Sequence, residues 1–395
     1  MNIAIWNIEK FTDARLLDQI ITTDTLFGGR TTTKYDRAPL LAYMQEVFTG
    51  NNTLAFMPEV FAVLEVLVDT NLALGAPPKK GGSGANGLLE LLKLIKKWTK
   101  NDSWHLVPPL KRNPVAVKGV KTAQSEVVGV FYDKSEVKFR GPYAWIAGQS
   151  QAPGAGASAA YPHPWNKADI TDGTKLAGQV RYYDSTRTEI TFPSLNHRRP
   201  FLVDFDELKG SQRHIRCAFM HTSPGFHIGG TQAMAEIDEL SGDAVGDPDI
   251  CVCGGDFNVN DYSTAVATKS YKPLYSKRYK KVLTPKVNHS THYYPKRKAK
   301  PSNRFEYMQE ELIDNFLVRY RTKTAAKKAK YSGYSIDIVY PSPAPPFIPT
   351  LQDKLSRYPK FKKGDKPGPA ALFRQWENFF HIRRCSDHTA IFLTI

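Results

Sequence analysis

The chain has 395 residues, 41% of them hydrophobic and 12% aromatic, which is enough for a substantial core and excludes a disordered or fibrous protein. Its 54 Lys and Arg against 38 Asp and Glu give a formal net charge of +16. We therefore expect a polyanionic partner, nucleic acid first and an anionic membrane surface second. No apolar run reaches the roughly 18 to 20 residues that span a bilayer.

The first predicted element is a strand in "MNIAIWNIEKF", which lacks the charged, apolar and small-residue zones of a leader peptide. The four cysteines lie in or beside apolar runs and lack zinc-site spacing, so we interpret them as reduced core residues. They are Cys217, Cys251, Cys253 and Cys385. These features predict a soluble, cytoplasmic protein with no stable membrane association; signal-independent export stays open.

Seven short apolar segments predict the strands of the fold. In chain order they are residues 2–8, 60–66, 127–133, 214–221, 249–256, 314–319 and 389–395. Several are apolar on both faces, which is typical of central strands that are covered on each side. Two helices are predicted among them, over residues 88–98 and over residues 231–242, the second with a candidate cap at Thr231 and a stop at Gly242. This mixture predicts a layered α/β fold.

Four long inserts without periodicity separate these elements. They are residues 75–87, 148–195, 262–305 and 341–369, approximately. We expect surface loops, because none of the inserts sustains a second core and the candidate site residues lie on both sides of each. The chain is therefore predicted to form one domain over residues 1–395.

Polar residues stand where the predicted strands begin or end. Asn7 follows "IAIW", Glu65 follows "FAVL", His221 follows "CAFM", Asp256 and Asn258 follow "CVCGG", and Asp387 and His388 precede "TAIFLTI". One such residue is an ordinary turn or cap. Several carboxylates beside buried strands are costly unless they are paired or bind a metal ion, so the set indicates a functional site.

These segments carry a family resemblance. The segments are, in chain order, "IAIWNIEKF", "VFAVLEV", "MHTSP", "GGDFNVN", "LIDNFLVR" and "SDHTAI". Together they resemble the endonuclease/exonuclease/phosphatase superfamily, whose relatives include deoxyribonuclease I and exonuclease III. The resemblance spans essentially the whole chain. It implies a four-layered α/β sandwich, in which two mixed sheets pack face to face with helices outside, as in deoxyribonuclease I.

The resemblance also implies a metal site. Glu65 corresponds to the principal ligand of a catalytic divalent ion, with Asn7 and Asp387 nearby. Oxygen ligands and a phosphate substrate favour Mg²⁺ or Mn²⁺.

Catalytic roles are implied for the residues that follow the later strands. Asp256 and Asn258 are expected to position the attacking water and the scissile phosphate. His388 is expected to contact the phosphate or take a proton, oriented by Asp314. Asp337 in "YSIDIVYP" is the alternative orienting acid.

A second histidine pair follows from "SEVVGVFYDKSEV", which resembles the deoxyribonuclease I segment whose glutamate orients a catalytic histidine. Here Glu126 is expected to orient His221, which can pass a proton to or from an ester oxygen. The alternative for Glu126 is a solvated residue at the start of a strand. In "NHRRPFLVDF", Arg198 is the expected phosphate contact, with Arg199 as its competitor.

The third insert bears on the substrate. Residues 262–305 contain twelve Lys or Arg and no Asp or Glu, with tyrosines interleaved. Cations attract phosphates regardless of sequence, and tyrosines can stack on bases; the alternative is a solvated charged face. We predict a metal-dependent nuclease that hydrolyses DNA with little sequence preference.

The alternatives to a DNA nuclease are a ribonuclease, a phospholipid or inositol-phosphate phosphodiesterase, and a non-catalytic nucleic-acid-binding module. The sequence leaves open nicking against double-strand cutting, the biological role, an immunity or delivery partner and the oligomeric state.

Overall fold

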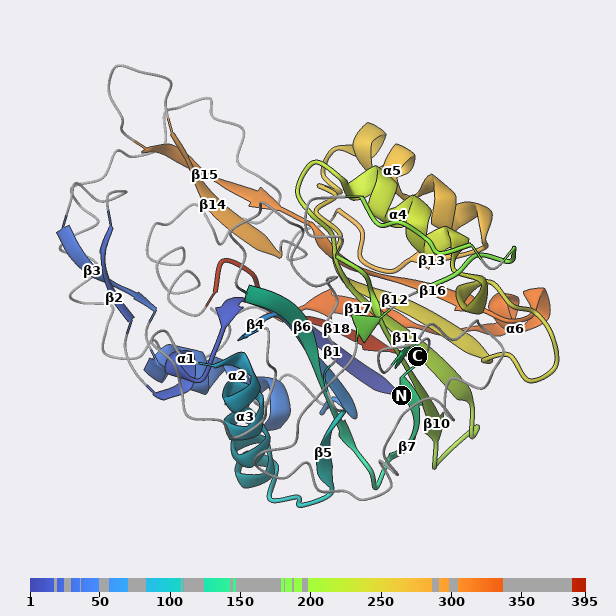
Figure 1. Ribbon diagram of the computed structural model, residues 1–395, viewed down its shortest axis with the longest axis horizontal. Coiled ribbons are helices and arrows are strands. Elements are labelled where there is room, and N and C mark those ends of the chain that lie inside the picture. Colours follow the sequence, from blue (N-terminus) through green and yellow to red (C-terminus); the bar gives the residue numbers. More distant parts are fainter. Residues whose placement is uncertain are drawn as a thin grey trace.

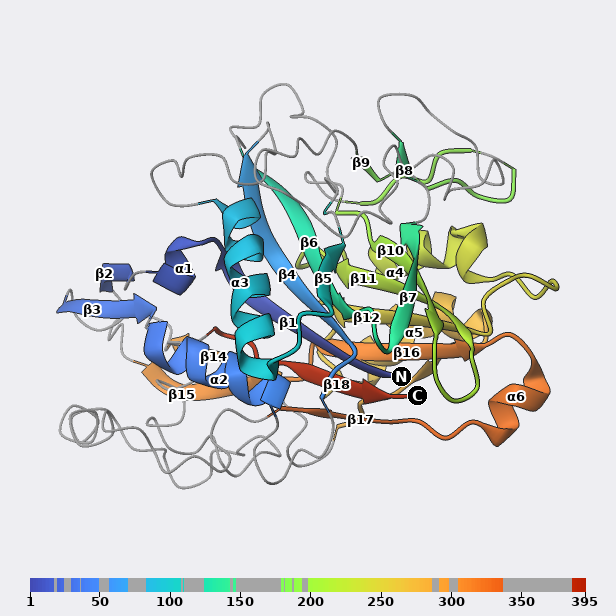
Figure 2. The same cartoon turned by 90° about the horizontal axis from the view of Figure 1, so that it is seen from below.

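The computed structural model has two six-stranded mixed sheets lying face to face, with helices on the outer face of each (Figures 1 and 2). It describes residues 1–17, 20–24, 30–35, 37–49, 57–69, 83–107, 109, 124–142, 145–146, 179–180, 182–186, 188–193, 198–285, 291–297, 305–336 and 386–395. The predicted four-layered α/β sandwich is therefore confirmed, and all seven predicted strands belong to these two sheets. Among the described helices, none combines the length and the apolar character that crossing a bilayer requires.

The first sheet brings together strands from both ends of the sequence. In spatial order it contains β17 (Ser332–Ser335), β18 (Ile391–Thr394), β1 (Asn2–Phe11), β4 (Val60–Asp69), β6 (Gln124–Asp133) and β5 (Trp104–Val107). β1 and β4 run parallel, and the other neighbours run antiparallel.

The second sheet is built from the middle of the chain. In spatial order it contains β13 (Lys280–Lys281), β16 (Asp314–Tyr320), β12 (Ile250–Asp256), β11 (His214–His221), β10 (Phe201–Glu207) and β7 (Val137–Pro142). Its parallel pair is β11 and β12, and the other neighbours are antiparallel. Each sheet thus has one parallel pair near its centre.

Helices and short ribbons complete the structure. The helices are α1 (Ala14–Leu17), α2 (Arg37–Thr49), α3 (Gly84–Thr99), α4 (His227–Glu236), η2 (Asp238–Leu240), α5 (Thr264–Ser276) and α6 (Lys323–Lys328). The two-stranded ribbons are β2 (Ile20–Asp24) with β3 (Arg30–Tyr35), β8 (Trp145–Ile146) with β9 (Gln179–Val180), and β14 (His292–Arg297) with β15 (Phe305–Glu311). Figure 2 shows α2 and α3 beside the first sheet, with α4 and α5 beside the second.

The core follows from strand alternation. In β1, Ile3 and Ile5 pack between the sheets, whereas Trp6 packs toward α2. There the Trp6 ring contacts the Tyr43 ring edge-on, with the ring centroids 4.6 Å apart. A side chain at Gly254 of β12 would meet Ile5 of the opposite sheet and the ring of Phe316. The glycine therefore lets the sheets approach closely beneath the end of β12.

Two helix predictions need correction at their ends. α3 begins at Gly84 rather than at residue 88, because Ser83 caps it by accepting the backbone N–H of Asn86 at 3.4 Å. α4 begins at His227, so Thr231 is an interior residue and the predicted cap is wrong. The Thr231 hydroxyl instead donates to the Ser270 carbonyl of α5 at 2.5 Å and joins the two helices. The α4 segment then continues as η2 and does not extend to residue 242.

The predicted inserts are only partly loops. Residues 262–305 contain α5, whose Tyr271 and Leu274 are fully buried, so this prediction was wrong for the first part of the insert. Tyr279 is also buried, and neither buried tyrosine can stack on a base. Tyr182 and Phe192, near the end of the second insert, are buried in the inter-sheet core. Residues 341–369 lie outside the described residues, and the single domain stays a prediction.

Candidate active site

Three polar side chains form a row across the second sheet where β11 and β12 end. His221 of β11 is the register partner of Asp256 in β12, and Asp256 is the partner of Asp314 in β16. Register partners on adjacent strands point to the same face, and alternation from Gly254 directs this row toward the first sheet. All three side chains are buried. One imidazole and two carboxylates thus share a site where burial is costly unless they are paired.

The first sheet contributes Asn7 from β1, Glu65 from β4 and Glu126 from β6. Glu65 reaches the inter-sheet face because β4 is irregular: its φ is +56°, and the pairing with β6 shifts register between Val63 and Val66. Both valines pack toward the helices, so one extra residue changes the alternation and turns Glu65 to the opposite face. A non-glycine residue with positive φ is conformationally costly, and such positions concentrate at functional sites.

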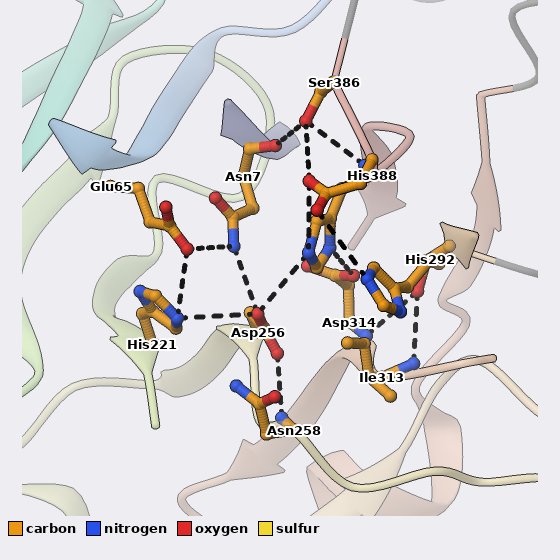
Figure 3. Close-up of polar contacts among 12 residues, drawn as sticks. Asn7, Glu65, His221, Asp256, Asn258, His292, Ile313, Asp314, Ser386 and His388 are labelled. Atoms are coloured by element: carbon orange, nitrogen blue, oxygen red, sulfur yellow. Dashed lines mark hydrogen bonds and ion pairs between the residues drawn. The ribbon is translucent and has the colours of Figure 1, made fainter. Parts of the chain in front are cut away.

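The turn after β12 explains the sequence "GGDFN". Gly255 has a φ of +136°, and a side chain there would collide with the Met220 carbonyl, so only glycine fits. Asn258 has a φ of +51°. Its backbone N–H donates to Asp256 Oδ1 at 2.8 Å, and its side-chain amide donates to the Thr222 carbonyl at 2.8 Å. Asp256 and Asn258 are therefore held in fixed orientations (Figure 3).

The first imidazole–carboxylate pair joins the two sheets. Nδ1 of His221 lies 2.8 Å from Oε1 of Glu126, a contact in which the ring N–H donates and Nε2 remains an acceptor. The same Nε2 lies 3.4 Å from Oε1 of Glu65 and 3.6 Å from Oδ2 of Asp256. The structure thus brings together the two residues that the sequence predicted as a pair, and Glu126 is buried rather than solvated.

The two candidate arginines point in different directions. Nη1 of Arg198 donates to Nε2 of His221 at 2.8 Å, while its Nε lies 3.0 Å from Oε2 of Glu126. Arg199 is buried elsewhere, where it donates to the Val180 carbonyl at 2.7 Å. Arg198 is therefore the arginine that lies at the site.

The second imidazole–carboxylate pair is His388 with Asp314. Nδ1 of His388 lies 2.7 Å from Oδ2 of Asp314, and Nε2 lies 3.8 Å from Oδ2 of Asp256. Burial alone would lower the pKa of His388, but the carboxylates of Asp314, Asp387 and Asp256 outweigh it and raise the pKa well above its usual range. Asp337, the competing acid, lies outside the described residues.

Asp256 is the point at which these groups meet. Its Oδ2 accepts the side-chain N–H of Asn7 at 3.1 Å and faces both imidazole Nε2 atoms. Burial raises the pKa of Asp256, and the nearby Asp314 charge raises it further, while His388 and His221 act in the opposite direction. A buried carboxylate between two imidazoles can hold or orient a proton-bearing group such as water.

The side chains at the ends of β1 and β4 fit a hard divalent cation. Nδ2 of Asn7 donates to Oε1 of Glu65 at 3.3 Å, whereas the buried Oδ1 of Asn7 has no hydrogen-bond partner among the described residues. A buried amide oxygen without a donor is suited to a cation. The Ser386 hydroxyl donates to the Asn7 carbonyl at 2.8 Å and lies 3.4 Å from Oδ1 of Asp387. Asn7, Glu65 and Asp387 therefore offer oxygen ligands at the same end of the sheet.

Sequence analysis did not single out His292, the first residue of β14. Its ring lies 4.6 Å from that of His388, and its Nδ1 lies 3.0 Å from Oε2 of Glu311. "STHYY" lies within the charged insert of residues 262–305 and has no feature that identifies its histidine as a site residue. Only the tertiary pairing with residue 388 reveals it.

No family model matches the chain, and no curated protein matches it. Solved structures do match across the whole chain. An endonuclease/exonuclease/phosphatase family protein from Leptotrichia buccalis is 11% identical with a TM-score of 0.45, covering 100% of this chain and 99% of its own. TDP2 from D. rerio, complexed with a single-strand DNA product, is 13% identical with a TM-score of 0.41, covering 100% and 99%.

A mannosyl-6-phosphatase from Bacteroides thetaiotaomicron is 11% identical with a TM-score of 0.41, covering 100% of this chain and 98% of its own. Several of the matching structures bear the name of the endonuclease/exonuclease/phosphatase family, the superfamily that the sequence motifs resemble. At such identities and TM-scores, activity and substrate have to be argued from the side chains of this chain.

Proposed function

We propose that the chain is a hydrolase of the endonuclease/exonuclease/phosphatase superfamily, a divalent-metal-dependent nuclease that cleaves the DNA backbone with little sequence preference. One observation carries the proposal. Two imidazoles, each paired through Nδ1 with a carboxylate, both direct Nε2 toward the buried carboxylate of Asp256, at 3.6 and 3.8 Å. This arrangement suits a reaction in which a water is oriented and a proton is transferred on either side of a phosphorus centre.

Glu65, Asn7 and Asp387 are the residues that would hold the metal. The orphaned Oδ1 of Asn7 and the carboxylates of Glu65 and Asp387 supply oxygen ligands, which favour Mg²⁺ or Mn²⁺. When bound, such an ion supplies charge stabilisation to a phosphoryl oxygen.

The remaining residues have distinct proposed roles. Asp256 orients the attacking water, and Asn258, held by two hydrogen bonds, directs the phosphate. His388, oriented by Asp314, presents Nε2 to the phosphate. His221, oriented by Glu126, transfers a proton to or from an ester oxygen.

Arg198 is proposed to bind a substrate phosphate. Its guanidinium already contacts Nε2 of His221 and is 18% exposed, so it combines a fixed position with access from solvent. A planar guanidinium suits phosphate oxygens. Because Arg198 and a substrate proton compete for Nε2 of His221, phosphate binding to Arg198 would release the imidazole for proton transfer.

The net charge of +16 favours a long polyanion over a small phosphate ester. The described cations of residues 262–305 divide into two groups. Arg278 is engaged with Asp243, and Lys281 pairs with Asp261 at 3.1 Å, so these two have roles inside the fold. Lys269, Lys272, Lys277 and Lys280 are exposed and free to attract a nucleic-acid backbone electrostatically.

The test is to incubate the purified full chain with supercoiled plasmid, RNA, phospholipid vesicles and an inositol phosphate in parallel, with Mg²⁺ or with EDTA. We expect the plasmid to be nicked or degraded with Mg²⁺ and spared in EDTA. Hydrolysis confined to RNA, lipid or inositol phosphate would replace DNA by that substrate. Binding to the plasmid without cleavage of any of the four would favour a non-catalytic module.

A further inference from the structure

One exposed lysine lies beside the proposed metal site in a costly backbone conformation. Lys10, near the end of β1, has a φ of +54°, in the left-handed region that residues other than glycine rarely adopt. The pairing of β1 with β4 shifts register between Asn7 and Phe11, so Lys10 lies in the irregular part of the strand. Glu65 lies at the same irregularity in β4, and its φ is also positive. The two strands are therefore distorted together at the end that carries the site.

This distortion gives the backbone of Lys10 a defined partner. Its N–H donates to Oε2 of Glu65 at 3.2 Å. The other oxygen of Glu65, Oε1, accepts the side-chain N–H of Asn7 at 3.3 Å and lies 3.4 Å from Nε2 of His221 (Figure 3). The backbone of Lys10 is therefore held directly against a carboxylate that contacts both sheets of the site.

The backbone role does not require a lysine. Every residue except proline has the N–H, and at a φ of +54° glycine avoids the steric cost of a Cβ. Packing does not explain the side chain either, because Lys10 is exposed and its ammonium has no ion-pair partner among the described residues. Lys100 has a similar φ of +52°, but there the left-handed conformation ends helix α3, a common use of it. Lys10 ends no helix, and a costly conformation at a site points to a function of the side chain.

We propose that Lys10 binds a backbone phosphate of the nucleic-acid substrate next to the scissile one, an assignment that deepens the proposed function and rests on it. An ammonium on a flexible stem attracts a phosphate without reading the base. Arg198 contacts His221 and Glu126, whereas Lys10 contacts Glu65, so the two cations belong to different parts of the site. A chain of phosphates can engage both cations at once, which a small phosphate monoester cannot. Lys10 therefore favours a polynucleotide as the substrate.

The experiment measures binding without turnover, by fluorescence anisotropy of a labelled DNA duplex with the full-length protein in EDTA, over about 50 to 200 mM NaCl. Lys10→Gly removes the cation and the strained Cβ, and Lys10→Gln keeps most of the stem. Each should flatten the slope of log K against log salt by about 0.9 and weaken binding about 3- to 10-fold near 0.1 M salt.

Lys100→Gly is the matched control. Lys100 is also an exposed lysine with a left-handed backbone, so its replacement removes the same charge and relieves the same strain. The next residue, Asn101, donates to Asp133 at 2.7 Å, at the opposite end of β6 from Glu126. This variant should therefore keep the wild-type slope and affinity.

Thermal melting establishes that each variant is folded. Wild-type slopes in folded Lys10→Gly and Lys10→Gln, or no measurable binding of the duplex by wild type, would overturn the phosphate contact. Equal flattening in Lys100→Gly would also overturn it, because the effect would then be one of net charge. If one of the two Lys10 variants does not fold, the other decides alone.

A second readout is the Mg²⁺-dependent cleavage of the same duplex. Lys10→Gln should raise KM by more than it lowers kcat, because the lost contact is one of substrate binding. A loss confined to kcat would place the effect on Glu65 and overturn the assignment. If wild type cleaves no duplex, the proposed function fails, while the anisotropy measurement still decides whether Lys10 binds a phosphate.

Discussion

Replacing Asp314 by Asn tests the orientation of His388 while keeping the size of the side chain. The wild-type contact is a buried, charge-assisted hydrogen bond of 2.7 Å between Oδ2 of Asp314 and Nδ1 of His388. Such a bond contributes about 1.5 to 3 kcal/mol, and 1.36 kcal/mol corresponds to tenfold in rate, so its loss alone predicts a decrease of about 10- to 100-fold.

The amide adds a second effect on the charge of the histidine. Together with Asp387 and Asp256, the carboxylate of Asp314 raises the pKa of His388 against the effect of burial, so the amide no longer stabilises the charged imidazole whose Nε2 faces Asp256 at 3.8 Å. Loss of an orienting acid costs up to about 10⁴ in rate in a serine-protease triad. We therefore expect kcat for plasmid cleavage to fall by about 10² to 10⁴ in Asp314→Asn, with little change in KM.

The assay is initial-rate nicking of supercoiled plasmid at saturating Mg²⁺, with thermal melting of each variant as the stability control. Asp206→Asn is a matched control, because Asp206 belongs to β10 of the same sheet and pairs with Arg140 at 3.4 Å, away from the site. Asp337→Asn is measured in parallel. An unaffected kcat in Asp314→Asn beside a crippled Asp337→Asn would refute the assignment, and comparable losses in both would refute a single orienting acid.

Three further predictions concern the metal, pH and backbone conformation. Glu65→Gln should lower the Mg²⁺-dependent rate by about 10² or more without lowering the melting temperature, as measured by plasmid nicking and calorimetry. Burial raises the pKa of Asp261 from 3.8 to about 6. Because this folded-state pKa lies above the unfolded value, the free energy of unfolding of the wild type falls as pH rises from about 4 to about 6 and then levels off. The free energy of unfolding of Asp261→Asn minus that of wild type should accordingly rise by about 2 kcal/mol from pH 4 to 6.5 in urea titrations, and a difference that does not change with pH would contradict the raised pKa of Asp261. Gly255→Ala should lower the unfolding free energy by about 2 to 5 kcal/mol, because its Cβ meets the Met220 carbonyl at a positive φ; a loss under about 1 kcal/mol would contradict the required close approach.

The central strands could be predicted because their signal is local. Segments such as "CVCGGD" are apolar on both faces, and burial between two layers demands that pattern. α5 was missed for the opposite reason. Its lysines and Pro273 suggest a loop, while Ala267, Tyr271 and Leu274, three and four residues apart, form the buried face that the charge obscured.

The site residues were predicted through motifs, but their geometry was not. Nothing in "FAVLEV" indicates that β4 gains a residue at Glu65 and turns its side chain toward the other sheet. Arg198 and Arg199 are adjacent and their side chains contact different partners, but the sequence does not indicate which of the two reaches His221. The position of His292 depends on a bridge to residue 388, and local patterns carry no information on such a distant pairing.

The most direct measurement of the central claim is the rate of plasmid nicking by Asp256→Asn at saturating Mg²⁺. Asp256 faces both imidazoles and accepts from Asn7 at 3.1 Å, so an amide there removes the acceptor that these groups share. We predict a rate at least about 10² lower than wild type with an unchanged melting temperature. A folded Asp256→Asn protein that nicks plasmid at the wild-type rate would contradict the proposed active site.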